Sequence, residues 1–361
     1  MTSTVSAASA ASGDAATLVP RPVIRVGSWL SLPYSPRALV VGAVSALVLL
    51  ALSVATLSTG SLGIPVPRLL ASIFGEQDAR AAFILNIYRG PRLVTAIGVG
   101  AAFGVAGALF QTVTRNPLGS PDVIGLSSGA SAGAATFGLL IPGILSVPLG
   151  ALVGSVVAIG LVWVGTGRGF TSPSRMILVG IGVSAMALAF VQFALTRVGS
   201  QDAVQLAAYI SGTLADRSWS DASVIWLAVV ILVPCAVLLA RRLDLVEMGD
   251  EIADALGART GLTRTLVVLI ALGLATAAVA AAGPISFVAL TAPQVAKRLA
   301  RAPGAGLILS AVVGACMMVL SDYVVQLGLF GVQLPVGLLT ACVGGVYLGY
   351  LLVREWKKGT V

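Results

Sequence analysis

Residues 241–264, RRLDLVEMGDEIADALGARTGLTR, decide the fold because they place a dense group of charges between long apolar runs. A charge at the centre of a bilayer costs about 3 kcal/mol on insertion scales, so such a segment is excluded from hydrocarbon. We therefore expect it to lie in water between two groups of membrane spans. It holds five of the chain's fourteen acidic residues, namely Asp244, Glu247, Asp250, Glu251 and Asp254.

Within this stretch, Gly249 and Gly257 flank a heptapeptide, residues 250–256, that has the features of a short helix. Its first turn is acidic, and the helix dipole favours negative charge there. A helix of about two turns is marginal in isolation, so this one needs a surface on which to pack. We expect that surface to belong to another protein; the alternative is an ordinary solvated helix in a loop.

The composition is that of a polytopic membrane protein. Hydrophobic residues make up 57% and charged residues 10% of the chain, and the mean hydropathy is +1.01. Soluble domains carry roughly 25% charged residues. The net charge of +8 would also suit a nucleic-acid-binding protein, but the basic residues are scattered between apolar runs. Positive-inside topology explains that scatter better than a phosphate-binding face, so no nucleic-acid partner is expected.

The sequence lacks the residue patterns of an enzyme or a metal site. It contains no histidine, which removes the commonest general base and metal ligand. Its three cysteines, Cys235, Cys316 and Cys342, lie in apolar runs without paired spacing. There is no G-x-x-x-x-G-K-[ST] loop, so the chain is not expected to hydrolyse ATP. We expect a transport or binding chain that is not an enzyme and has no cofactor, metal or disulfide.

At roughly 20 apolar residues per membrane span, the sequence predicts an all-α fold with ten spans. The eighth is short and is interrupted by Pro284 and Pro293, so we expect a bent or partial helix there. The spans define a membrane domain over residues 38–354, between a disordered tail (1–37) and a short tail (355–361). The candidate spans cover residues 38–59, 93–114, 122–142, 147–166, 176–196, 222–240, 265–282, 284–299, 306–328 and 335–353.

The basic residues predict the orientation of the chain in the membrane. With the N-terminus in the cytoplasm, ten spans place both termini and residues 241–264 on the cytoplasmic side, together with sixteen of the twenty-two lysines and arginines. Basic residues concentrate on that side of membrane proteins, so this orientation is favoured. The six outward exceptions are Arg68, Arg80, Arg89, Arg92, Arg197 and Arg217.

Arg89 and Arg92 lie in the sequence RGPR at the mouth of the second predicted span. One interpretation is that their side chains snorkel to the membrane interface. The other is a docking site for an acidic partner outside the membrane. The residues alone leave both interpretations open.

Charges inside the predicted spans are scarce, and Asp322 is the main candidate. A carrier driven by a proton or sodium gradient usually keeps buried carboxylates for its coupling ion. Their scarcity indicates that energy enters from elsewhere. A secondary carrier or channel that acts alone is the alternative.

Three further stretches carry a family resemblance. Residues 98–130 read GVGAAFGVAGALFQTVTRNPLGSPDVIGLSSGA, residues 283–290 read GPISFVAL and residues 334–337 read LPVG. Together with DEIADALGA at residues 250–258, they resemble the FecCD-type permeases of ABC importers for iron–siderophore complexes, the family of the cobalamin importer permease. The resemblance covers about residues 38–354.

The resemblance implies a type II ABC importer fold with ten spans per subunit, in the inner membrane of a bacterium. It implies a second FecCD-type permease subunit, identical or paralogous, two cytoplasmic ABC ATPase subunits, and a siderophore-binding protein outside the membrane. The implied mechanism is alternating access driven by ATP. The implied cargo is a ferric siderophore, with cobalamin or haem as alternatives, because no residue identifies the ligand.

The resemblance also implies that the short helix in the charged stretch is a coupling helix that rests in a groove of the ATPase. Ile252, Ala253 and Leu256 would form its apolar face, and its acidic residues would meet basic residues of the groove. The coupling residues implied in this way are Asp250, Glu251, Ile252, Ala253, Asp254, Leu256 and Gly257.

Arg89 and Arg92 match a basic pair that permeases of this family offer to acidic residues of the binding protein. A third family arginine is replaced here by Gln326. Gln294 lies where the family commonly has histidine, so hydrogen bonding is kept while a pH response is lost.

Two stretches match the family's cytoplasmic gate. Asn116 and Leu118, in NPLG, correspond to a closure of the pathway toward the cytoplasm. Thr171, Ser172 and Ser174 resemble the small polar residues of a second constriction. The alternatives are an ordinary turn at the first stretch and an ordinary loop at the second.

Overall fold

The computed structural model describes residues 23–357 of the 361-residue chain, apart from short gaps at 27–29, 34, 61–62, 74, 76–78, 168–169, 171, 302–303, 305 and 329–333. It begins with an antiparallel hairpin of β1 (Val23–Val26) and β2 (Leu30–Pro33), inside the region predicted as a disordered tail. Apart from this hairpin, the regular structure in the described chain is helical, which confirms the all-α fold.

All ten predicted spans coincide with helical segments. Within the described chain, seven helices are long and apolar enough to cross a membrane. They are α1 (Pro36–Ser58), α4 (Arg89–Thr114) with the turns before it, α6 (Val147–Thr166), α7 (Pro173–Leu195), α9 (Trp219–Glu247), α11 (Thr260–Ala282) and α13 (Leu307–Gln326).

Of the other three predicted spans, one lies on a divided helix, one on a short helix and one on the last helix of the described chain. The third is divided into η2 (Pro121–Ile124), α5 (Leu126–Ala135) and the π-helical turn η3 (Thr136–Leu140), with a break at Gly125, where φ is +84°. The eighth is the short helix α12 (Val288–Ala300), as its two prolines predict. The tenth is α14 (Val336–Lys357).

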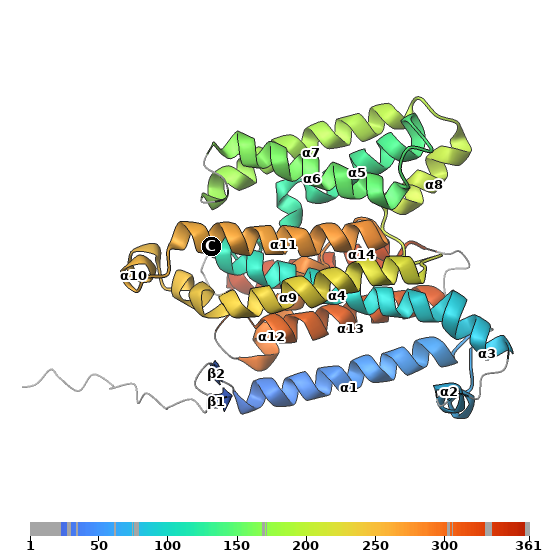
Figure 1. Ribbon diagram of the computed structural model, residues 1–361, viewed down its shortest axis with the longest axis horizontal. Helices are drawn as coiled ribbons and strands as arrows, with labels where there is room; N and C mark the ends of the chain where they lie inside the picture. Colours follow the sequence, from blue (N-terminus) through green and yellow to red (C-terminus); the bar gives the residue numbers. More distant parts are fainter. Residues whose placement is uncertain are drawn as a thin grey trace, which may run out of the picture.

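Short helices lie at the two ends of the bundle. α10 (Asp250–Ala255) is at one end, where the hairpin also lies, and α2 (Val66–Ile73), α3 (Ala79–Phe83) and α8 (Ser200–Ile210) are at the other (Figure 1). The π-helical turn η1 (Ile84–Tyr88) joins α3 to α4. We call these the α10 end and the α8 end.

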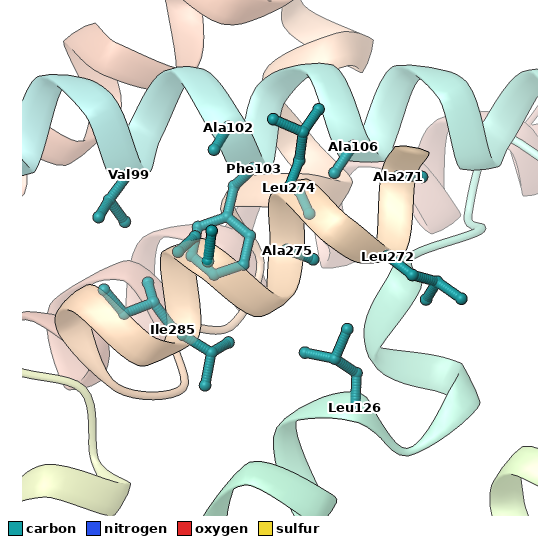
Figure 2. Packing of buried hydrophobic residues seen from close by; sticks show 14 of the residues in the cluster. Val99, Ala102, Phe103, Ala106, Leu126, Ala271, Leu272, Leu274, Ala275 and Ile285 are labelled. Atoms are coloured by element: carbon teal, nitrogen blue, oxygen red, sulfur yellow. The ribbon is translucent and has the colours of Figure 1, made fainter. Parts of the chain in front are cut away.

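α4 and α11 form the centre of the bundle and are the most buried of the spanning helices. Figure 2 shows Ala102, Phe103 and Ala106 of α4 close to Leu274 and Ala275 of α11, and all five side chains are shielded from solvent. Lipid tails are as apolar as these side chains, so close packing and not the hydrophobic effect holds such helices together. Small residues on α4 permit that approach.

Glycines allow the closest helix contacts. A Cβ at Gly100 would collide with the backbone of Gly314 on α13, and a Cβ at Gly154 on α6 would collide with the backbone of Gly129 on α5. Both belong to GxxxG pairs, which predict such packing. The pair Gly345 and Gly349 on α14 differs, because an added Cβ there meets no atom within 4 Å.

Candidate functional site

α10 exposes apolar side chains at its end of the bundle. Ile252 and Leu256, one turn apart, are 49% and 61% exposed, and Met248, two residues before the helix, is 62% exposed. The prediction that Ala253 belongs to this exposed face is wrong. Ala253 is fully buried, because the helix packs against the bundle through it. Exposed apolar side chains in a segment that must face water indicate an interaction surface. Met248 was missed from the sequence, although its spacing of four residues from Ile252 offered a signal.

The acidic residues of α10 are used mainly within the chain. Asp250 accepts hydrogen bonds from Arg264 on α11 and from Arg115 at the end of α4. Asp254 accepts from the backbone N and the Oγ1 of Thr260, at 2.8 and 3.0 Å, and so caps the first turn of α11. Glu251 is exposed and forms no hydrogen bond or ion pair within the described chain, which leaves it directed to solvent.

The electrostatic surroundings of Asp250 favour its charged form. Partial burial raises the pKa of the carboxyl, but hydrogen bonds from Arg264 and then Arg115, with the attraction of both guanidinium charges, outweigh this and leave the pKa below its ordinary value. The carboxylate is therefore ionised at neutral pH. Neither arginine partner was identified from the sequence; Arg115 is 135 residues and Arg264 is 14 residues away from Asp250 in the chain.

The predicted gate residues of NPLG form a tight turn directly after α4. The side chain of Asn116 accepts from the backbone N of Leu118 at 2.9 Å, and the backbone N of Gly119 donates to the carbonyl of Asn116 at 3.0 Å. Leu118 is 42% exposed at this turn. Gln294 on α12 donates to the carbonyl of Pro117 at 3.0 Å and so holds the turn from the other side.

Gln294 also connects α12 to the body of α4. Its Nε2 donates to Oε1 of Gln111 at 2.9 Å, and Gln111 donates to the carbonyl of Leu290 at 2.9 Å. A neutral amide can donate and accept at once, so Gln111 and Gln294 satisfy one another and the two backbone carbonyls without a charge. Here the glutamine at position 294 acts as a hydrogen-bonding bridge.

The second predicted gate stretch precedes α7. Ser172 is the N-cap of that helix, and Ser174 is exposed in its first turn. Thr171 lies outside the described residues. Within the described chain, no hydrogen bond joins these serines to Asn116 or Leu118. The two stretches are connected through packing, because α7 contacts η2, which follows the NPLG turn; a Cβ at Gly180 would collide with the backbone of Val123.

Arg89 at the α8 end is directed into the bundle. Only 6% of the residue is exposed, and its Nη1 donates to the carbonyls of Thr56 and Thr59, each at 2.6 Å. These carbonyls belong to the last turn of α1 and its C-cap, which would otherwise lack partners. The side chain thus neither snorkels to the interface nor faces an external partner in this conformation.

Arg92 is also engaged within the chain. Its Nε donates to both oxygens of Asp322 at 2.9 and 3.0 Å, and its Nη2 donates to Oδ1 at 2.6 Å. Gln326 donates to the same carboxylate at 2.7 Å. Asp322 is 1% exposed. The carboxylate predicted as the main intramembrane charge is therefore neutralised by an arginine, and Gln326 completes its hydrogen bonding.

No group of three or more metal-ligating side chains occurs within the described part of the chain. What the geometry does define is a bundle of membrane-spanning helices with a small helix at one end, whose apolar side chains are exposed, and the NPLG turn next to it. These features define a multi-pass membrane protein.

Comparisons with known proteins agree with this class. The FecCD transport family matches residues 47–354, so the chain belongs to this family and is a permease subunit of an ABC importer. It is 37% identical over 303 residues to the ferric enterobactin permease FepG of Escherichia coli, covering 84% of this chain and 92% of that protein. It is 33% identical over 317 residues to the Fe(3+)-citrate import permease YfmE of Bacillus subtilis, covering 87% and 94%.

A solved structure supports the fold. A protein described as an inward-facing conformation of a metal-chelate type ABC transporter superposes with a TM-score of 0.76 at 24% identity, covering 88% of this chain and 99% of that chain. The predicted all-α membrane fold agrees with this similarity.

Proposed function

We propose that this permease carries ferric siderophore or related ferric chelate complexes across the inner membrane of a bacterium. The support for the cargo comes from relatives that are named for ferric enterobactin, Fe(3+)-citrate and Fe(3+)-hydroxamate. Cobalamin and haem are the alternative cargoes. The proposed assembly contains a second permease subunit, identical or paralogous, two cytoplasmic ABC ATPases and an extracytoplasmic binding protein.

The observation that carries the proposal is the exposure of Ile252 and Leu256 on α10. In our proposal these side chains and Gly257, which ends the helix with φ of +78°, seat α10 in the ATPase, and Glu251 faces its basic groove. ATP-driven closure of the two ATPases then displaces α10 and tilts the spans. ATP hydrolysis belongs to the separate ATPase chain, and this end of the bundle and both termini face the cytoplasm.

The proposed gate consists of the NPLG turn, with Asn116 and Leu118, and the stretch before α7, with Thr171, Ser172 and Ser174. The exposure of Leu118 and Ser174 supports their access to a pathway. Small side chains at such a position can close by contact and reopen with a modest tilt of α7. The docking role proposed for Arg89 and Arg92 requires a second conformation, in which Arg92 releases Asp322 and Arg89 releases the end of α1.

Uptake of labelled ferric siderophore into proteoliposomes tests the function. We expect uptake only when the permease, the ATPase, the binding protein and ATP are all present. A secondary carrier or channel, the rival proposal, would transport without the ATPase. Uptake that persists without ATP would therefore overturn the proposal, and uptake of cobalamin in place of the siderophore would revise the cargo.

A further inference from the structure

Arg115 occupies the junction between α4 and the NPLG turn. It is the C-cap of α4 and adopts a left-handed backbone with φ of 48°, so it is the point at which the chain leaves the helix. Its guanidinium extends across the α10 end to α9, where Nε and Nη2 donate to the carbonyl of Val246 at 3.2 and 2.5 Å. The same Nη2 donates to Oδ1 of Asp250 at 2.5 Å. One side chain thus connects the end of α9 and the start of α10 to the residue that directly precedes the NPLG turn.

Arg264 holds the same carboxylate from a different direction. Its Nη1 donates to Oδ2 of Asp250 at 2.8 Å and its Nη2 donates to Oδ1 at 2.7 Å, a bidentate geometry that fixes the plane of the carboxylate. The side chain of Arg264 is 11% exposed, whereas those of Arg115 and Asp250 are 40% and 45% exposed. Arg264 therefore anchors and orients the carboxylate, and Arg115 reaches it from a helix that is distant in sequence.

The two arginines that bind Asp250 belong to different helices. Arg264 lies on α11, the helix that directly follows α10 in the chain, nine residues after Ala255. Arg115 belongs to α4, and its ion pair with Asp250 is the contact that links α10 to the residue before the gate turn. On the far side of the turn, Gln294 of α12 holds the carbonyl of Pro117 at 3.0 Å. The turn is thus held between α10 on one side and α12 on the other.

We propose that the ion pair between Asp250 and Arg115 is the joint that transmits displacement of α10 to the gate turn at residues 116–119. Asp250 and Arg115 are positioning residues, and Arg264 keeps the carboxylate aimed at Arg115. This inference rests on the proposed function, in which the ATPase moves α10. Without the joint, α10 still binds the ATPase through Ile252 and Leu256, and its movement no longer reaches the turn.

The test uses the complete transporter in proteoliposomes and measures two rates in each sample, ATP hydrolysis and uptake of labelled ferric siderophore. We expect Arg115→Gln and Asp250→Asn each to lower the uptake per ATP hydrolysed by about fivefold or more, the usual size of a coupling effect between sites. Binding of the ATPase subunit, measured in parallel, should remain unchanged. A merely structural role would lower assembly and both rates together.

A double-mutant cycle identifies the pair. If the two residues act through one contact, the double variant should lose no more coupling than the more impaired single variant. Arg115→Lys, which keeps the charge but not the planar fork, should restore part of the coupling. Lys297→Gln is the matched control, because it removes the 3.7 Å ion pair of Lys297 with Glu247 at the same end without touching the gate turn. It should keep the uptake per ATP of the unmodified chain.

Several results would overturn the joint. Unchanged uptake per ATP in both single variants would do so, as would additive losses in the double variant or an equal loss in Lys297→Gln. If the Arg115→Gln chain fails to assemble, Asp250→Asn decides, and full assembly of that variant with no change in uptake per ATP overturns the joint. A different result, absence of ATP-dependent uptake by the unmodified chain, would overturn the proposed function and the joint with it.

Discussion

Arg92 and Asp322 form an ion pair at the α8 end that is shielded from solvent, with side-chain exposures of 12% and 1%. Removing one partner of such a pair leaves an uncompensated buried charge, whereas replacing both by apolar residues is far better tolerated. We expect Asp322→Ala to lower the free energy of unfolding by about 3 kcal/mol. Thermal unfolding of the purified chain in detergent measures this.

The matched control is the double variant Arg92→Met with Asp322→Leu. Because it removes both charges, it should recover most of the stability that the single variant loses. A single variant as stable as the unmodified chain, or a double variant less stable than the single one, would contradict the assigned pairing.

The ion pairs of Asp250 predict a pH dependence at the α10 end. A carboxyl whose pKa is lowered by folding stabilises the folded chain above its unfolded pKa of about 3.9, and this contribution is lost as the pH falls through the lowered value. The stability difference between the unmodified chain and Asp250→Asn should therefore be constant from pH 8 to pH 5 and shrink below pH 4. Melting curves of both chains across this range provide the measurement. A difference that disappears already near pH 6 would exclude this role.

At the residue scale, the sequence indicated which residues are unusual but not their partners. Arg89 and Arg92 were recognised as exceptions, yet nothing in RGPR predicts that one meets carbonyls at the end of α1 and the other a carboxylate on α13. Such contacts depend on how helices distant in sequence pack. Asp250 was likewise assigned to an external groove, whereas its carboxylate is bound by two arginines of its own chain.

The coupling role that we propose for α10 depends on its exposed face. Leu256 is 61% exposed, so its replacement should leave the fold of the permease intact. An aspartate there places a charge in an apolar interface, and hot-spot residues of this kind cost about 2 kcal/mol or more, roughly a thirtyfold loss of affinity. We expect Leu256→Asp to weaken ATPase binding to this extent, as measured by titration of the ATPase onto the permease in nanodiscs. Leu256→Met, which keeps an apolar side chain, should bind normally, and equal binding by both variants would refute the assignment.

The two kinds of GxxxG pair predict opposite effects of the same substitution. Gly154→Ala on α6 forces α5 and α6 apart and should lower stability by about 1–3 kcal/mol. Gly345→Ala on α14 meets open space, so it should be neutral or stabilise the helix by up to about 1 kcal/mol. Thermal unfolding of the two variants in the same detergent compares them directly. Equal destabilisation by both variants would show that the close backbone contact between α5 and α6 does not determine the effect of the substitution.

The limits of a helix were predicted accurately where the helix is one continuous apolar run. Continuous runs such as those of α1 and α6 appear in the structure within about two residues of the predicted limits. The predicted start of the helix through α4 was the least accurate limit. The helix continues back through η1 to Ala79, and the polar residues of that stretch hide the extension. The burial of Ala253 was missed for a different reason, since a helix of six residues has too few turns to define a face.

The whole molecule has an orientation that its two ends make testable. Ile252 on α10 and Val204 on α8 are both exposed, by 49% and 69%, and lie at opposite ends of the bundle (Figure 1). In a background without the three native cysteines, each position replaced by cysteine reports the side on which its end lies. A membrane-impermeant thiol reagent added to intact spheroplasts should label Val204→Cys and leave Ile252→Cys unmodified. Lysis should then make Ile252→Cys reactive, because the positive-inside distribution predicts that the α10 end lies in the cytoplasm. Labelling of Ile252→Cys in intact cells would invert the topology and with it the assignment of α10 to a cytoplasmic ATPase.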